Sequence, residues 1–365
     1  MRVLIAVPSL DRHFGGPVVK VMALATALRQ AGAQVSVVGA SNEQLDGAHT
    51  LPYSFRYHGT PWPRGLGQVR QGVREADIVH VVGFRDPVGT MAALSAARCG
   101  VAYLLEPAGM LRRRGRSALV KSVFDATLGR RVLARARRFV VTSELERREV
   151  IEFGVEPSRI AMRPNGVTAV ESLPLRGGLR QRLGIPEGAP LVIAIGRIAE
   201  KKGLLPLLHS VAALPGVHVV IAGPSDADGT LEQLLAAREA LGERNRIHLS
   251  PDGLWGDAKV QAYVDADICC LYSRHENFGQ AALEAASHGL PVVVSDRVGA
   301  AEFLGDGCVV VPIENPAALT ATLGRLCTKA PERARIGVAA RAAAERLSWN
   351  TVAAAQLSIY AEALA

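Results

Sequence analysis

Residues 272–296, YSRHENFGQAALEAASHGLPVVVSD, decide the fold of this chain. A polar loop that contains Glu276 opens the stretch, and an alanine-rich apolar run follows over residues 280–287. His288 and Gly289 are typical of a helix end, and the apolar run after them is typical of a buried strand. The stretch therefore predicts a loop, a short helix and a parallel strand, which is the repeating unit of an α/β sheet.

The start of this helix is a predicted anion site. Asn277, Phe278 and Gly279 lie at its N-terminus, where N–H groups and the helix dipole favour negative charge. Gly279 lets a phosphate approach the backbone closely. Glu276 and Glu284 are then placed to accept hydrogen bonds from hydroxyl groups on either side of the phosphate. A nucleotide-sugar has this order of groups; the alternative is that both glutamates belong to an ordinary exposed helix face.

A longer stretch, HENFGQAALEAASHGLPVVVSDRVGAAEFL, resembles the signature of glycosyltransferase family 4, the retaining nucleotide-sugar enzymes. The matching positions are Glu276, Phe278, Gly279, Glu284, Ala285, Gly289, Pro291, Val292, Val293 and Gly299. The resemblance implies an α/β fold of two facing Rossmann-like domains, the GT-B architecture, with the active site in the interdomain cleft. It implies an acceptor domain over residues 1–170, joined by a C-terminal helix at about 349–365, and a donor domain over residues 171–348.

The segment LVIAIGRIAEKKGL, residues 191–204, predicts a buried strand that ends at Gly196. Arg197 and Lys202 follow in the next loop. Ligands bind at the carboxyl ends of strands in open α/β sheets, so two cations here suit a diphosphate. The spacing resembles the family's G-R-x-x-x-x-K-G pattern, which implies that Arg197 and Lys202 clamp the donor phosphates.

The resemblance implies transfer of a hexose from a UDP- or GDP-sugar to a hydroxyl acceptor, with retention of configuration. The acceptor would be a lipid-linked glycan, a polysaccharide precursor or a natural product. Arg197, Lys202 and the helix dipole at Gly279 would stabilise the leaving phosphate, and no metal or other cofactor is expected. Glu276 would orient the sugar hydroxyls and Glu284 would hold the ribose. Two DxD pairs, at residues 226–228 and 265–267, spell a metal motif of transferases of another fold, and their context indicates coincidence.

The N-terminal half begins with the apolar run RVLIAVP, a predicted strand, and a helix and a second strand complete a βαβ unit. Gly15 and Gly16 resemble the family's glycine loop, which faces the donor diphosphate and the acceptor; a flexible strand-to-helix turn is the alternative. At LEPAGML, residues 105–111, many members carry a histidine that contacts the donor sugar, and this chain has Ala108. His13 is the nearest candidate to replace that histidine.

Ala108 leaves rival functions open. Either the site works without the histidine, or the chain is a catalytically impaired nucleotide-sugar-binding protein. A sugar-nucleotide epimerase of similar architecture is a further rival, although the spacing of Glu276 and Glu284 argues against it. The products distinguish these functions, because they are a new glycoside, no reaction or an altered free nucleotide-sugar.

Length and composition indicate a two-domain globular protein. The chain has 365 residues, of which 49% are hydrophobic, and that length exceeds one ordinary core. No apolar run approaches the ~20 residues of a membrane span, and the N-terminus predicts a strand rather than a signal peptide. Five cysteines without CxxC spacing predict buried, reduced thiols and a cytoplasmic location.

Positive charge is concentrated in the first half. The net charge is +8, and residues 1–170 hold 24 basic and 13 acidic residues. From Arg112 to Arg138 there are ten basic residues and one acid, Asp125, with apolar residues between them. This pattern predicts an interfacial helix at the inner face of an anionic membrane, where a lipid-linked acceptor would lie. An inward apolar stripe with solvated arginines is the alternative; a nucleic-acid partner is not expected, because stacking aromatics are few.

Overall fold

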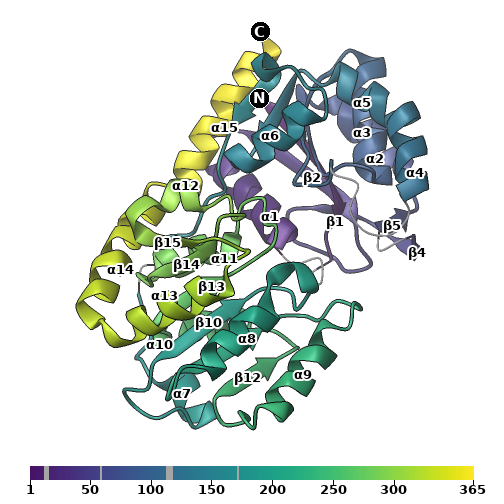
Figure 1. The fold of residues 1–365 in the computed structure, drawn as a ribbon. Helices are drawn as coiled ribbons and strands as arrows, with labels where there is room; N and C mark the ends of the chain where they lie inside the picture. The colour runs from purple at the N-terminus through teal and green to yellow at the C-terminus, as the bar shows by residue number, and fades with distance from the viewer. Residues whose placement is uncertain (12–15, 58–59, 112–117, 171) are drawn as a thin grey trace. The chain divides into compact units, whose positions relative to one another are not determined.

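The computed structural model describes residues 1–11, 16–57, 60–111, 118–170 and 172–365. The chain divides into two compact units. Unit 1 comprises Met1–Gly166 and Trp349–Ala365, and unit 2 comprises Val167–Ser348. Each unit is built on its own parallel sheet with helices on both faces (Figure 1).

The sheet of unit 1 has seven parallel strands in the order β3-β2-β1-β6-β7-β8-β9. The strands are β1 (Arg2–Ser9), β2 (Gln34–Ala40), β3 (His49–Leu51), β6 (Ile78–Val82), β7 (Ala102–Glu106), β8 (Arg138–Val141) and β9 (Ile160–Met162). Strand β1 is buried along almost its whole length. Its continuous apolar sequence follows from this position, because helices cover both faces of a central parallel strand.

The helices of unit 1 form two layers. Helices α1 and α15 pack on one face of the sheet, and residues of α2, α3, α5 and α6 belong to the cluster on the other face. The helices are α1 (Gly16–Gln30), α2 (Leu66–Glu75), α3 (Pro87–Cys99), α4 (Ala118–Phe124), α5 (Arg130–Arg135), α6 (Glu144–Glu152) and α15 (Trp349–Leu364). A π-helical segment, Asp125–Gly129, joins α4 to α5. The C-terminal helix α15 therefore completes the core of the first unit.

The sheet of unit 2 has six parallel strands in the order β12-β11-β10-β13-β14-β15. They are β10 (Leu191–Ile195), β11 (His218–Ala222), β12 (Ile247–Ser250), β13 (Ile268–Leu271), β14 (Val292–Ser295) and β15 (Cys308–Val311). Counted within the unit, this order is 3-2-1-4-5-6, the strand order of a Rossmann sheet. Unit 1 has the same order with one more strand at its edge, and the predicted pair of Rossmann-like domains is confirmed.

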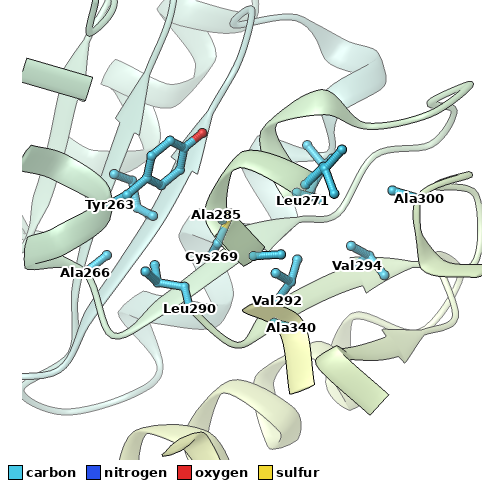
Figure 2. Packing of buried hydrophobic residues seen from close by; sticks show 14 of the residues in the cluster. Tyr263, Ala266, Cys269, Leu271, Ala285, Leu290, Val292, Val294, Ala300 and Ala340 are labelled. Atoms are coloured by element: carbon cyan, nitrogen blue, oxygen red, sulfur yellow. The ribbon is translucent and has the colours of Figure 1, made fainter. Parts of the chain in front are cut away.

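Two apolar layers enclose the second sheet. One layer contains residues of α7, α10, α11 and α14, and the other contains residues of α8, α9 and α13. The helices are α7 (Gly178–Leu183), α8 (Leu204–Ala212), α9 (Thr230–Ala240), α10 (Gly256–Asp265), α11 (Gln280–Ser287), α12 (Ala301–Leu304), α13 (Pro316–Thr328) and α14 (Ala330–Glu345). Figure 2 shows Ala285 of α11 among the side chains of β13 and β14. Small residues on α11 let this helix approach the sheet closely.

Two elements differ from the sequence prediction. The sequence pattern predicts one helix over residues 316–347, whereas the structure has two, α13 and α14, because Pro331 in the first turn of α14 favours a helix start. A short antiparallel hairpin, β4 (Tyr53–Tyr57) and β5 (Thr60–Pro63), stands beside the first sheet and was not predicted. Two of the four residues of β5 are prolines, which is unusual for a strand, and the sequence pattern therefore did not predict it.

The cysteines are only partly buried. Cys269 and Cys270 lie in β13, and burial raises the pKa of the Cys269 thiol to about 12. Cys99 at the end of α3 is exposed, so the expectation that all five thiols are buried is wrong. Among the described residues, no helix combines the length and apolar character needed to cross a membrane.

Candidate active site

The loop after β10 begins with a close approach of two backbones. A Cβ atom on Gly223, which follows β11, would lie 1.9 Å from the carbonyl oxygen of Gly196. Glycine is therefore required where these loops leave the sheet. Arg197 then extends toward the next loop, and its Nη1 lies 2.8 Å from Asp226 Oδ1. Both side chains are more than a third exposed, so this ion pair contributes only about 0–1 kcal/mol.

Lys202, from the same loop, forms an ion pair with Glu276 from the loop after β13. Two backbone features fix these loops together. A Cβ atom on Gly203 would lie 2.0 Å from the carbonyl oxygen of Tyr272, and the Arg274 N–H donates to the Lys201 carbonyl at 2.8 Å. Strands β10 and β13 are neighbours at the point where the strand order reverses. This switch point is where ligands bind in doubly wound sheets.

The Glu276 loop is also bonded to residues 297–300. The Glu276 N–H donates to the Arg297 carbonyl at 2.9 Å, and the Glu276 carbonyl accepts from Gly299 at 3.1 Å. Phe278 is buried, and its ring lies 5.8 Å from that of Phe303. The Phe278 side chain therefore anchors the loop in the core. Only the backbone of Phe278 remains available for the predicted contact with the donor.

Gly279 begins helix α11 with a φ of 101°, a conformation that L side chains rarely adopt. A Cβ atom there would lie 2.8 Å from Val298 Cγ1, so space also requires glycine. No side chain caps this helix, and Asn277 lies two residues before Gly279. The helix dipole favours an anion at this end.

Glu284 lies on α11 and is held by two side chains of α10. Lys259 Nζ lies 2.6 Å from Glu284 Oε2, and the Tyr263 hydroxyl donates to the same oxygen at 3.1 Å. Burial and the Glu284 charge raise the pKa of Tyr263, so the phenol stays protonated. Sequence reasoning missed Lys259 and Tyr263; their spacing of four residues on one helix face was the only signal.

The two DxD pairs have structural partners. Asp265 accepts hydrogen bonds from the backbone N–H groups of Gly177 and Leu179 at the start of α7. Asp267 pairs with Arg180 at 2.7 Å. Asp228 accepts from the Glu200 N–H at 2.9 Å. Among the described residues, no group of His, Cys, Asp and Glu side chains has the arrangement of a metal site.

In unit 1 the predicted glycine loop is described only in part. Gly16 is the first residue of α1, whereas Gly15 and the candidate His13 lie outside the described residues. Ala108 lies in the turn of residues 107–110, where the Met110 N–H donates to the Pro107 carbonyl at 3.0 Å. The φ of Ala108 is 50° and that of Gly109 is 72°. A non-glycine residue in this conformation costs of order 1 kcal/mol and is often found at functional sites.

Buried polar groups hold this turn from two sides. Glu146 accepts from the Gly109 N–H at 2.9 Å, and Arg85 donates to the carbonyls of Met110 and Leu111. Arg85 is itself paired with Asp125 at 2.7 Å, and both side chains are nearly buried. Arg85 also has a positive φ, 65°. The strained turn is therefore fixed by tertiary contacts.

A buried carboxylate lies at the end of β7, just before this turn. Glu106 is fully buried and forms ion pairs with Lys20 and with Arg163, the latter at 2.5 Å. Burial alone would raise the pKa of Glu106, but the two cations outweigh it and hold the pKa well below its usual range. His80 Nε2 lies 3.2 Å from Glu106, and its Nδ1 lies 2.8 Å from the Tyr360 hydroxyl. This network joins α1, strands β6 and β7, the residue that follows β9, and α15.

The second unit thus gathers Arg197, Lys202, Glu276 and Gly279 at the carboxyl edge of β10 and β13, and Glu284 lies further along α11. Ala108 and Gly16 belong to unit 1. Together, fold and site define a class: a protein of two Rossmann-like domains whose second domain carries a cationic, glycine-led helix start at the switch point of its sheet.

Comparison with known families agrees with this class. Residues 176–343 match the family described as "Glycosyl transferases group 1", and residues 15–166 match the "Glycosyl transferase 4-like domain". Together the two matches cover most of both units. The chain belongs to the family of glycosyltransferases built from these two domains.

Curated relatives include D-inositol 3-phosphate glycosyltransferases. The protein from Xylanimonas cellulosilytica is 32% identical over 244 residues, covering 64% of this chain and 58% of the relative. That from Streptomyces bingchenggensis is 31% identical over 248 residues, covering 64% and 54%. The chain therefore spans a little over half the length of these relatives.

Solved structures share the fold. HepE from Anabaena, in complex with UDP and glucose, superposes with a TM-score of 0.83 at 17% identity, covering 99% of this chain and 100% of that one. Sucrose-phosphate synthase from Thermosynechococcus elongatus gives a TM-score of 0.77 at 18% identity, with 99% and 98% covered.

Proposed function

We propose that this chain transfers a hexose from a nucleoside-diphosphate sugar to a hydroxyl acceptor, with retention of anomeric configuration. Family membership supports glycosyl transfer. The HepE complexes with UDP, with UDP and glucose, and with UDP-glucose support a UDP-sugar as the donor.

The observation that carries the proposal is the position of the Lys202–Glu276 pair at the switch point, next to the uncapped start of α11. In this proposal the donor diphosphate lies at Gly279 and contacts Lys202 and Arg197. Because both side chains of the Arg197–Asp226 pair are more than a third exposed, Arg197 exchanges Asp226 for phosphate at little cost.

Each charged group then has a role. As the glycosidic bond breaks, negative charge grows on the leaving diphosphate, and two cations and a helix dipole stabilise it without a metal. Glu276, beside Lys202, orients hydroxyls of the transferred sugar. Glu284, fixed by Lys259 and Tyr263, accepts hydrogen bonds from the ribose.

Donor titration followed by product analysis tests this function. UDP, GDP and their hexose conjugates are titrated by calorimetry, and a bound donor stabilises the protein by ~2.7 kcal/mol at 100 times its Kd. The anomeric configuration of the glycoside is then read by NMR. An inverted product contradicts retention, an altered free nucleotide-sugar indicates an epimerase, and binding without product indicates an impaired enzyme.

A membrane-bound acceptor is a second proposal, favoured by the exposed face of α4 and the π-helical segment. Val120 and Val123 are 47% and 58% exposed, Leu128 is 37% exposed, and Arg130 and Arg131 are exposed just beyond them. An inward-facing apolar stripe does not account for these three side chains. Apolar residues among arginines suit an anionic lipid surface.

Vesicle co-sedimentation tests this second proposal. Binding to anionic vesicles is expected to fall as salt rises, because surface attraction is screened over about 10 Å at 0.1 M. Val123→Ser is expected to weaken binding, and Val338→Ser, at an exposed position of unit 2, serves as the control. Absence of binding at low salt points to a water-soluble acceptor.

A further inference from the structure

The hairpin β4–β5 carries an exposed aromatic pair that the proposed reaction has not used. Phe55 is 55% exposed and Trp62 is 50% exposed. Their ring centroids lie 6.4 Å apart, and the ring planes differ by only 10°. Only 5% of the chain is aromatic, so two parallel aromatic side chains in solvent need an explanation.

The backbone holds both rings in place. Residues 54 and 55 together oppose Trp62, because the pairing shifts between Tyr53–Pro63 and Arg56–Pro61. Such a bulge re-aims side chains and is often found near active sites. Pro61 and Pro63 are buried on either side of the exposed Trp62, and each proline fixes its own φ. The tryptophan therefore stands on a rigid strand.

The hairpin is tied to the carboxyl end of β1. The Tyr53 hydroxyl and Arg56 Nη2 both donate to Asp11 Oδ2, each at 2.6 Å. Asp11 is buried and lies two residues after β1. Strands β1 and β6 mark the switch point of the first sheet. Figure 1 shows the hairpin beside β1 in unit 1. The aromatic pair thus borders the ligand-binding edge of this unit.

The size of the aromatic pair and the residues around it indicate which class of ligand it binds. Because each ring is only about half exposed, the pair offers roughly half of the at most about 500 Å² of two whole aromatic side chains, whereas a standard protein interface buries about 800 Å² on each partner. Ser54, Arg56 and Arg64 around the rings are polar and exposed, so the patch suits a small polar ligand with one apolar face. A pyranose ring is such a ligand, because its C–H groups meet the negative face of an aromatic ring and its hydroxyls reach neighbouring polar groups.

We propose that Phe55 and Trp62 form a sugar-binding platform that receives a hexopyranose ring of the acceptor. The inference rests on the proposed glycosyl transfer and adds a substrate class for the first unit: an acceptor that carries a sugar ring near its reactive hydroxyl. The charged residues to which the proposed function gives donor contacts (Arg197, Lys202, Glu276 and Glu284) lie in unit 2, whereas the platform lies in unit 1, so the two ideas fail separately.

Fluorine NMR of protein labelled with 5-fluorotryptophan tests the platform. The chain has three tryptophans, and the Trp62 signal is assigned by its loss in Trp62→Phe. Methyl glucopyranosides, methyl mannopyranosides and maltose are the probes. We expect at least one probe to shift the Trp62 signal in a saturable way and to leave Trp255, which is 52% exposed in unit 2, unchanged.

Three variants distinguish a loss of aromatic stacking from a loss of folding. Phe55→Ala is expected to lower the affinity for the saccharide probe at least fivefold. Tyr53→Phe, which removes one hydrogen bond to Asp11, is expected to lower that affinity less. Val338→Ala is the exposed control. Stabilisation by UDP should persist in Phe55→Ala, which shows that the donor site is intact.

Two outcomes overturn the platform. One is a Trp62 signal that no saccharide moves; the other is a Trp62 signal that moves only with phosphatidylglycerol vesicles, which would make the hairpin a membrane anchor. If the unmodified protein does not bind UDP, the proposed donor site is contradicted. A saccharide-induced shift of the Trp62 signal would still support the platform.

Discussion

Removing the Lys202 ammonium should weaken UDP binding more than removing the Arg197 guanidinium. Charge-assisted hydrogen bonds to phosphate contribute about 1.5–3 kcal/mol each, and each 1.4 kcal/mol is tenfold in affinity. Arg197→Ala leaves Asp226, which is a third exposed, so a loss of about tenfold is expected. Lys202→Ala also leaves the less exposed Glu276 carboxylate beside the diphosphate, and a loss of about a hundredfold is expected.

Calorimetric titration with UDP measures these losses, because UDP has no hexose for Glu276 to contact. The double variant Lys202→Met/Glu276→Gln removes both charges and should recover part of the affinity lost in Lys202→Met. With the single variant Glu276→Gln, these titrations complete a double-mutant cycle that gives the coupling energy of the pair. Arg335→Ala, which removes an exposed cation of α14 in the same unit, is the control, and thermal unfolding checks that each variant is folded.

Two results would refute this reasoning. If Arg197→Ala and Lys202→Ala bind UDP as tightly as the parent protein, the diphosphate does not lie at this loop. If the double variant binds no better than Lys202→Met, Glu276 exerts no repulsion on the ligand and the pair has another purpose.

Further predictions concern the first unit and pH. Ala108→His should raise kcat with little change in UDP affinity, because the histidine that the family resemblance implies at this position would contact the donor sugar rather than the phosphates. Histidine also tolerates the positive φ of this position better than most residues; an unchanged or lower kcat would show that the site works without histidine. Arg85→Met should destabilise the protein by about 3–5 kcal/mol in urea unfolding, since it removes the cation from nearly buried Asp125; a loss below 1 kcal/mol would contradict this. Burial and His218 lower the pKa of His248 from 6.5 to about 4. The unfolded chain therefore takes up a proton that the folded chain does not, and stability present above pH 6.5 should fall between pH 6.5 and about 4. His248→Gln should lessen that fall, and an identical pH profile would exclude His248 as a cause.

The sequence by itself determined the two Rossmann-like domains. Apolar runs such as RVLIAVP, and the loop–helix–strand stretch at residues 272–296, are local patterns whose period reflects burial. Glycine at position 279 was also readable, because its role depends on the backbone of one turn. Arg197, Lys202 and Glu276 were named from spacing and family resemblance.

Only the tertiary structure determined which side chains contact each other. It paired Lys202 with Glu276 and Arg197 with Asp226 across loops far apart in the chain. It placed the Phe278 ring in the core and Cys99 in solvent. Side-chain contacts depend on strand order and register, which link residues distant in sequence and leave no local period.

The hairpin shows the same limit most clearly. Prolines in β5 argue against a strand when the sequence is considered alone, and they are tolerated because the hairpin lies outside the main sheet. The bond from Tyr53 to Asp11 spans 42 residues. Folding alone brings these residues together, and with them the aromatic pair that borders the first sheet.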